Sequence, residues 1–157
     1  MWKFHGPRTW QVQPPALWQH GSVLYIRFEA AEADEHGRRT GIFGLANVLA
    51  RSGALSPEDW TWWRSNNDWL DAAYPDPGKA DPTLFDKSVY PHATCWFKDT
   101  AVHLLDRVPG YLALLDRYEV SWREVRSAVP GVVLYEDADQ IVVTPSGAPR
   151  STPAVAD

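Results

Sequence analysis

Residues 93–144 read ATCWFKDTAVHLLDRVPGYLALLDRYEVSWREVRSAVPGVVLYEDADQIVVT, and this stretch decides the fold. Residues 93–98 combine aromatic and small apolar side chains between turn-forming residues, which is typical of a short strand. The next segment repeats apolar residues at steps of three and four, which predicts a helix with one face in a core. This apolar stripe consists of Ala101, Leu104, Leu105, Val108, Leu112 and Leu115. Pro109-Gly110 interrupts the stripe and predicts a kink or a brief break, because proline lacks a backbone donor.

Three further strands are predicted after this helix. They cover residues 122–127, 132–135 and 140–144. A short acidic turn joins the last two strands, which predicts an antiparallel hairpin. A strand, a helix and a strand in succession predict a crossover between parallel neighbours, and the hairpin then extends the sheet with antiparallel edge strands.

The first half of the chain supplies the remaining elements. Residues 22–30 predict a strand, because apolar and polar side chains alternate along them. Residues 40–52 predict a helix, and a second helix runs from the Ser-Pro start at residue 56 to about residue 73. Residues 74–89, rich in proline, predict a loop or lid. Together these elements predict an α+β fold, with a mixed, largely antiparallel sheet of about four to five strands and helices packed mainly on one face.

The length of 157 residues predicts one domain. We expect residues 1–145 to form this single globular domain. Residues 1–21 are too rich in tryptophan for a free tail and predict an N-terminal arm packed on the domain. Residues 146–157 turn to serine, proline, alanine and glycine, which predicts a disordered tail.

Composition narrows the classes of function. The net charge of −5 makes nucleic acid an unfavourable partner. A single cysteine excludes an internal disulfide framework and fits a reducing compartment. The first residues lack the apolar run of a signal peptide, and no apolar run of about eighteen residues occurs, so we expect a cytoplasmic protein without a membrane segment. Nine tryptophans are the unusual feature of this chain.

One face of the predicted sheet combines aromatic and charged side chains. If the apolar residues of strand 22–30 face the helices, the alternating residues of three strands meet on the opposite side. The predicted members of this face are Tyr25, Arg27, Glu29, Trp96, Lys98, Trp122, Glu124 and Arg126. Such a face suits flat or charged ligands and partner surfaces. The alternative is that the tryptophan-rich helix or the N-terminal arm covers it as ordinary packing.

The tryptophan-rich helix strengthens the first interpretation. Trp62, Asn66 and Trp69 share one face of this helix. An amide between two rings would be a polar anchor in an apolar wall, as ligand pockets commonly have. We therefore predict that these two rings form one aromatic neighbourhood with Trp96 and Trp122. This neighbourhood would bind a small anionic or aromatic ligand, or a protein partner.

A second candidate site lies at the start of the first helix. Residues 38–44 (RRTGIFG) follow a strand, and backbone donors at a helix start attract phosphate. The segment resembles the Arg-x-x-Gly-x-Gly pyrophosphate loop of the acyl-CoA N-acyltransferases, with Phe43 where the last glycine stands and Gly44 after it. This resemblance implies a small-molecule transferase with an anionic cofactor at Thr40–Gly44. The residues that would hold the phosphate are Arg38, Arg39, Gly41 and Gly44. A solvated loop before an ordinary helix is the alternative.

No other motif indicates a reaction. The histidines have no metal-ligand spacing, and no cofactor is indicated outside the phosphate alternative. Cys95 alternates with Phe97 toward the predicted core, which favours a buried small side chain over a nucleophile. A non-catalytic binding or protein-interaction domain is therefore the first functional hypothesis, and the transferase is the alternative.

Overall fold

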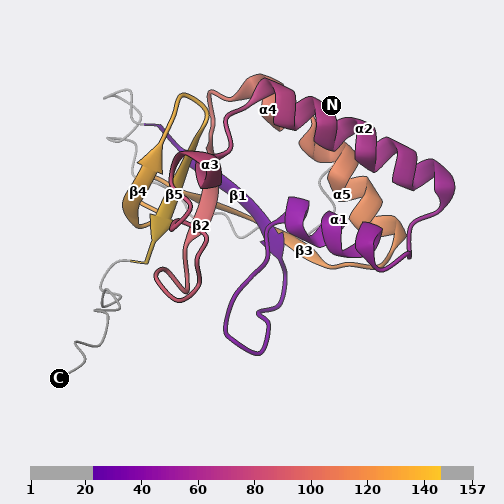
Figure 1. Ribbon diagram of the computed structural model, residues 1–157, viewed down its shortest axis with the longest axis horizontal. Coiled ribbons are helices and arrows are strands. Elements are labelled where there is room, and N and C mark those ends of the chain that lie inside the picture. Colours follow the sequence, from indigo (N-terminus) through magenta and orange to yellow (C-terminus); the bar gives the residue numbers. More distant parts are fainter. Residues whose placement is uncertain (1–22, 146–157) are drawn as a thin grey trace.

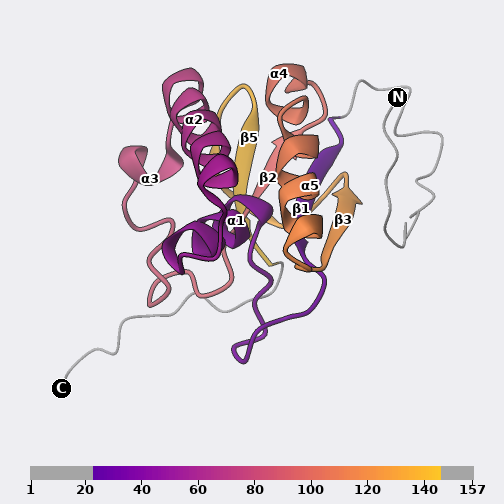
Figure 2. The ribbon, with the colours of Figure 1, turned by 90° about the vertical axis from the view of Figure 1, so that its right-hand side faces the viewer.

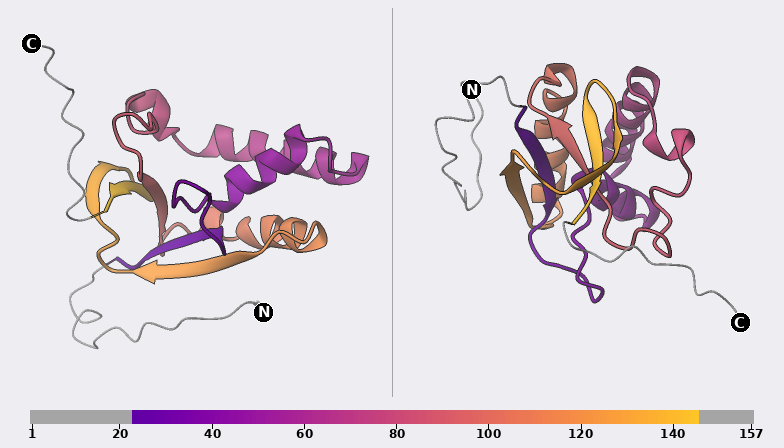
Figure 3. Two further views of the ribbon diagram at one scale, coloured as in Figure 1. Left: turned by 90° about the horizontal axis from the view of Figure 1, so that it is seen from below. Right: turned by 90° about the vertical axis from the view of Figure 1, so that its left-hand side faces the viewer.

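Five strands form one sheet in the order β3-β1-β2-β5-β4, and every neighbouring pair is antiparallel (Figure 1). The computed structural model describes residues 23–145, so the predicted N-terminal arm and C-terminal tail lie outside the described residues. The strands are β1 Tyr25–Ala30, β2 Thr94–Lys98, β3 Trp122–Ser127, β4 Val132–Glu136 and β5 Gln140–Thr144. The helices are α1 Ile42–Arg51, α2 Pro57–Ala73, α3 Pro77–Ala80, α4 Val102–Leu105 and α5 Val108–Arg117. The predicted α+β class is confirmed, with the long helices gathered on one face (Figures 2 and 3).

The connection from β2 to β3 differs from the prediction. Both strands pair antiparallel with β1, so they run parallel to one another but are not neighbours. The predicted crossover between adjacent parallel strands is therefore wrong. The reason is that β1 pairs with β3 along its whole length, from Tyr25 opposite Ser127 to Ala30 opposite Trp122. A ladder of this length satisfies the backbone donors and acceptors along one edge of β1.

The main core lies between the sheet and the long helices. The helical stripe predicted after β2 is present and is interrupted, but at residues 106–107 and not at Pro109-Gly110. Helix α4 ends at Leu105, and α5 begins at Val108 with Pro109 in its first turn, where a proline is tolerated. Helix α1 buries residues spaced four apart, as an amphipathic helix does. The fully buried side chains of this core include Ile42, Val108, Tyr111, Leu114 and Leu115.

Helix α2 begins as its sequence predicts. The Ser56 side chain accepts a hydrogen bond from the Asp59 backbone N–H at 3.1 Å, and Pro57 occupies the first helical position. Arg117 and Tyr118, at the end of α5, both contact the Asp59 carboxylate at 2.8 Å, which joins the two helices. Within residues 23–145 no helix has both the length and the apolar run needed to cross a bilayer.

A second apolar cluster lies on the opposite face of the sheet. Trp96, Ile141 and Val143 form it, with Tyr25 and Val125 packed against them. The pairing of Trp96 with Ile141 across β2 and β5 places these two side chains on one face. The strands β1 and β2 therefore have the facing predicted from their alternation, with Ile26 in the main core and Trp96 opposite.

Gly131 comes just before β4 and lies against the end of β5, where a side chain should be poorly tolerated. A Cβ atom there would lie 2.3 Å from the backbone oxygen of Thr144. We expect Gly131→Ala to lower the free energy of unfolding by about 1–3 kcal/mol, because the hairpin backbone must shift. Chemical denaturation measures this change.

Gly41→Ala is the matched control for this substitution. A Cβ at Gly41 would meet the Arg27 guanidinium at 3.5 Å, an ordinary contact, and Gly41 has a φ of −65° that any residue adopts. This variant should cost at most about 1 kcal/mol, because alanine is a poorer N-cap than glycine but meets no steric barrier here. Equal losses in the two variants would contradict the steric argument.

Candidate functional site

A cleft of about 910 Å³ opens where β1 and β2 diverge. Their ladder pairs only Tyr25 with Lys98 and Ile26 with Phe97, and beyond these pairs the two strands separate. The walls come from the end of β1, from parts of residues 34–47, from the end of α2 with its following turn, and from parts of residues 85–95. The predicted loop at residues 74–89 contains the short helix α3 and supplies part of one wall.

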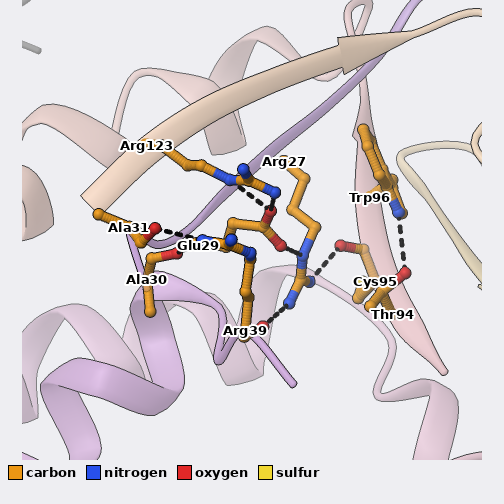
Figure 4. Close-up of polar contacts among 9 residues, drawn as sticks. All are labelled: Arg27, Glu29, Ala30, Ala31, Arg39, Thr94, Cys95, Trp96 and Arg123. Atoms are coloured by element: carbon orange, nitrogen blue, oxygen red, sulfur yellow. Dashed lines mark hydrogen bonds and ion pairs between the residues drawn. The ribbon is translucent and has the colours of Figure 1, made fainter. Parts of the chain in front are cut away.

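A network of ion pairs joins Arg27, Glu29 and Arg123 (Figure 4). Arg27 and Glu29 are only 8% and 6% exposed, although both are charged. The Glu29 carboxylate accepts from Arg27 Nε at 2.7 Å and from Arg123 Nη2 at 2.7 Å. Each carboxylate oxygen therefore has its own guanidinium, which offsets the cost of burying the charges. This network connects β1 to its neighbour β3.

Beyond the two residue pairs of β1 and β2, a side-chain contact of Arg27 connects these strands. Its Nη1 donates to the Cys95 carbonyl oxygen at 2.9 Å, and its Nη2 donates to the Arg39 carbonyl oxygen at 2.7 Å. One side chain thus joins β2 to the loop before α1. Gly41 lies against the same guanidinium, so the start of α1 comes close to this charge. Arg27 is therefore a structural member of the cleft wall, because each of its three nitrogens already donates to a protein acceptor.

The loop before α1 is held in place by its own residues. The Asp34 carboxylate accepts from the backbone N–H groups of His36 and Arg38 at 2.8 and 2.9 Å. The Arg38 N–H is the main reason that the pKa of Asp34 lies below its usual value. Arg39 donates from Nη1 to the carbonyl oxygen of Ala31 (Figure 4). These contacts fix the arginine pair beside the start of α1.

The start of α1 has unused hydrogen-bond donors. Gly41 is the N-cap and provides no side-chain acceptor, and within residues 23–145 the first-turn N–H groups of Phe43 and Gly44 have no backbone acceptor. Arg38 Nε is buried and also lacks a partner in the described part of the chain. Arg38 and these first-turn residues all line the cleft. An anion is the species that would satisfy both kinds of donor.

Two amides, those of Asn47 and Asn67, form a polar strip in the cleft wall. Asn47 Oδ1 accepts from Trp63 Nε1 at 3.0 Å and from Asn67 Nδ2 at 3.1 Å. Asn67 Oδ1 in turn accepts from the Tyr111 hydroxyl at 2.5 Å. Burial raises the pKa of Tyr111 well above its usual value, so its hydroxyl keeps its proton as a donor. The strip is surrounded by apolar lining side chains, which include Phe43, Leu70, Tyr74 and Phe97.

Cys95 and Gln140 lie on the β2–β5 side of the cleft. The Cys95 thiol donates to Gln140 Oε1 at 3.2 Å, and Gln140 Nε2 donates to the Pro75 carbonyl oxygen at 3.0 Å. Burial raises the pKa of the Cys95 thiol to about 12. Because the thiolate is the nucleophile, this environment makes Cys95 a structural thiol. Within the described range, no group of three or more metal-ligating side chains is close enough to hold a metal ion.

The predicted phosphate-binding residues line the cleft, whereas most residues of the predicted aromatic face do not. Arg38, Arg39, Gly41 and Gly44 all line the cleft. Of the eleven residues named for the predicted aromatic and charged site, Arg27 and Glu29 line the cleft. Trp96 is 8% exposed and donates to Thr94, while Lys98 pairs with Glu136 at 2.8 Å, so these two polar groups are satisfied within the sheet.

The predicted facing of β3 is wrong. Phe28 lies opposite Glu124 and Ile26 lies opposite Arg126, so the side chains of Glu124 and Arg126 lie on the helical face. Trp122 belongs to the main core, with its ring 6.4 Å from that of Phe28, and its Nε1 donates to Asp116 at 2.8 Å. Trp122 and Trp96 are therefore on opposite sides of the sheet, and the predicted single aromatic neighbourhood does not exist.

Trp62, Asn66 and Trp69 lie on one side of α2 as predicted, but they pack against the segment of Arg107 and Tyr111 and not against Trp96. Asn66 accepts from Arg107 at 3.1 Å, and the Arg107 guanidinium stacks 3.8 Å from the centre of the Trp69 ring. Trp62 packs edge-on against Tyr111 with ring centres 5.0 Å apart. Asn66 and both rings thus join α2 to α4 and α5, and none of the three lines the cleft.

Sequence reasoning missed most of the polar cleft residues. Asn47, Asn67 and Gln140 occur in helix or strand segments with no motif around them. One signal was available: Asn47 lies four residues after Phe43 on α1, so the two share a helix face. The pairing of Asn47 with Trp63 of α2 has no counterpart in local sequence.

The fold and the cleft together define a class: an α+β domain with a ligand-sized cleft at the fork of its central strands. Comparisons with protein-family models, with curated proteins and with solved structures give no match in any of the three. The function of the protein is therefore inferred from the geometry of the cleft.

Proposed function

We propose that this protein binds a small molecule with an anionic group, and that the anionic group lies at the start of α1. The observation that carries the proposal is the coincidence of three features on one cleft wall. These are the buried Arg38 Nε without a partner in residues 23–145, the uncapped first turn of α1, and the cleft volume of about 910 Å³. Small-molecule pockets commonly have volumes of roughly 300–1,000 Å³.

The charges and dipoles at this place favour an anion. The first-turn N–H groups carry the positive end of the helix dipole, and Arg38 and Arg39 add formal charge beside them. A bound phosphate or carboxylate would accept from Arg38 Nε and from the first-turn donors. Buried donors left without an acceptor are costly, so an anion would also stabilise this part of the fold. Arg27 supports the site from behind through its contacts with Glu29 and the Arg39 carbonyl oxygen.

Binding without catalysis is the function that we propose for the cleft. Cys95, the single cysteine of the chain, lines the cleft, has a pKa raised to about 12 and is held as a thiol by Gln140. The Tyr111 hydroxyl behind the amide strip also keeps its proton. A reduced thiol of this kind fits the cytoplasm, where we place the protein. The acyltransferase resemblance concerns the same residues, and under this proposal they hold the anionic part of a ligand.

Arg38→Ala should weaken anion binding at least about tenfold, because a charge-assisted hydrogen bond contributes about 1.5–3 kcal/mol. Inorganic phosphate and pyrophosphate are the probes, added at constant ionic strength with chloride as the balancing ion. The melting temperature of the full chain should rise with saturation, since a ligand that binds only the folded state stabilises it. Calorimetric titration of the same probes gives the dissociation constants.

Arg64→Ala is the matched control for Arg38→Ala. Arg64 pairs with Asp68 on the exposed side of α2 and does not line the cleft. Arg64→Ala and Arg38→Ala each remove one positive charge from the protein, so general electrostatic effects should be equal in the two variants. The proposal fails if neither probe binds with saturation, or if the two variants lose affinity equally.

A further inference from the structure

We infer that Asn47 is a second specificity-determining residue of the cleft and recognises an uncharged hydrogen-bond acceptor of the ligand, such as a carbonyl oxygen or a ring nitrogen. This inference rests on the proposed function, because it adds a second contact to the same bound molecule. It assigns the ligand to a narrower chemical class: a phosphorylated or carboxylated molecule whose uncharged part also accepts hydrogen bonds.

The orientation of the Asn47 amide is determined by its neighbours. The indole N–H of Trp63 can only donate, so the atom that it contacts at 3.0 Å must be the amide oxygen. Asn67 Nδ2 donates to the same oxygen at 3.1 Å. Two donors from different residues of α2 thus fix the oxygen toward α2. The Asn47 NH₂ group is left as the other end of the amide.

This NH₂ group is available to a ligand. Asn47 lines the cleft, and no hydrogen bond from Asn47 Nδ2 is recorded among residues 23–145. Arg38 Nε is the one buried polar side-chain atom of that range without a partner, so Asn47 Nδ2 is not sealed inside the protein. An amide NH₂ donates and does not accept. The ligand atom opposite Asn47 must therefore be an acceptor.

The spacing along α1 sets the size of the ligand. Phe43 and Asn47 are four residues apart on a helix, which corresponds to a rise of about 6 Å. The acceptor recognised by Asn47 should therefore lie on the order of 6–8 Å from the anionic group at the first turn. Between and beside these points the wall is apolar and aromatic, with Phe43, Leu70 and Tyr74 among the lining residues. A flat ring with acceptor atoms, attached through a short spacer to the anion, fits this arrangement.

Uridine 5′-monophosphate and ribose 5-phosphate are a suitable pair of probes. Both carry a phosphate on the same sugar, and only the first adds a flat ring with carbonyl acceptors. Calorimetric titration of the full chain should give an affinity for the nucleotide at least about tenfold higher than for the sugar phosphate. In Asn47→Asp this ratio should fall below about threefold, because the donor is replaced by an acceptor. A carboxylate oxygen can still accept from Trp63 and Asn67, so the fold should persist.

Asn66→Asp is the control, because it makes the same chemical change on a residue of α2 that does not line the cleft. This variant should keep the wild-type affinity ratio. Nuclear magnetic resonance provides a test without substitution: the side-chain NH₂ signal of Asn47 should shift on titration with the nucleotide and not with the sugar phosphate.

The possible outcomes separate the two proposals. If the wild type binds both probes with equal affinity, or if Asn47→Asp keeps the full ratio, the role of Asn47 is wrong while anion binding stands. If phosphate, sugar phosphate and nucleotide all fail to bind, anion binding itself fails and the role of Asn47 fails with it.

Discussion

Glu29→Gln should lower the free energy of unfolding by about 3–5 kcal/mol, because it removes one partner of a buried ion pair and leaves the other charge uncompensated. Glu29 is 6% exposed and accepts from both Arg27 and Arg123. The amide would place an NH₂ donor against a guanidinium that also only donates. Urea denaturation of the full chain measures the change. The same variant should weaken phosphate binding, since Arg27 supports the loop that carries Arg38 and Arg39.

Glu124→Gln is the control, because it makes the same change in a pair at the edge of the sheet. Glu124 accepts from Arg126 at 2.6 Å, but the Arg126 side chain is 44% exposed. Solvent screens such a pair, so this variant should cost at most about 1 kcal/mol. If the two variants lose equal stability, the buried network does not hold β1 against β3.

Leu115→Ala should lower the free energy of unfolding by about 2–5 kcal/mol. Leu115 has 0% of its surface exposed and lies in the main core on α5. The truncation removes buried methyl groups and leaves a cavity between the helix and the sheet, which the packed surroundings can fill only in part. Chemical denaturation with an unchanged m-value would show that the loss is one of stability and not of cooperativity.

Leu105→Ala is the comparison for Leu115→Ala, because it deletes the same atoms. Leu105 lies on the same predicted stripe but is only partly buried at the end of α4. It should therefore cost clearly less than Leu115→Ala. A larger loss at Leu105 would mean that the core is centred on α4 and not on α5.

The strands and the long helices of the described chain could be predicted because their signals are local, whereas the short helix α3 lies in a segment predicted as a loop. Helix α2 runs from Pro57 to Ala73 as its capping serine and proline indicate. The strands β3 and β5 have the predicted bounds, and the hairpin of β4 with β5 is confirmed as antiparallel. Strict alternation of apolar and polar residues also determined which face of β1 lies in the core.

The facing of β3 could not be predicted in the same way. Its sequence, WREVRS, has apolar residues at Trp122 and Val125, three positions apart, so the strand period of two places them on opposite faces. Either face could then have been the buried one. The register with β1 determines which face of β3 points toward the helices, because Ala30 lies opposite Trp122 and Phe28 opposite Glu124. This choice separates Trp122 from Trp96 and removes the predicted aromatic site.

By itself the sequence determined the five strands and the long helices, the α+β class and the presence of an arginine-rich helix start at residues 38–44, since each of these depends on residues close together in the chain. The tertiary structure alone decided that β1 lies between β2 and β3, that β1 and β2 diverge after two residue pairs, and that Asn47 meets Trp63. These features depend on contacts between segments far apart in the chain. Their free energies come from burial and pairing, which local periodicity does not encode.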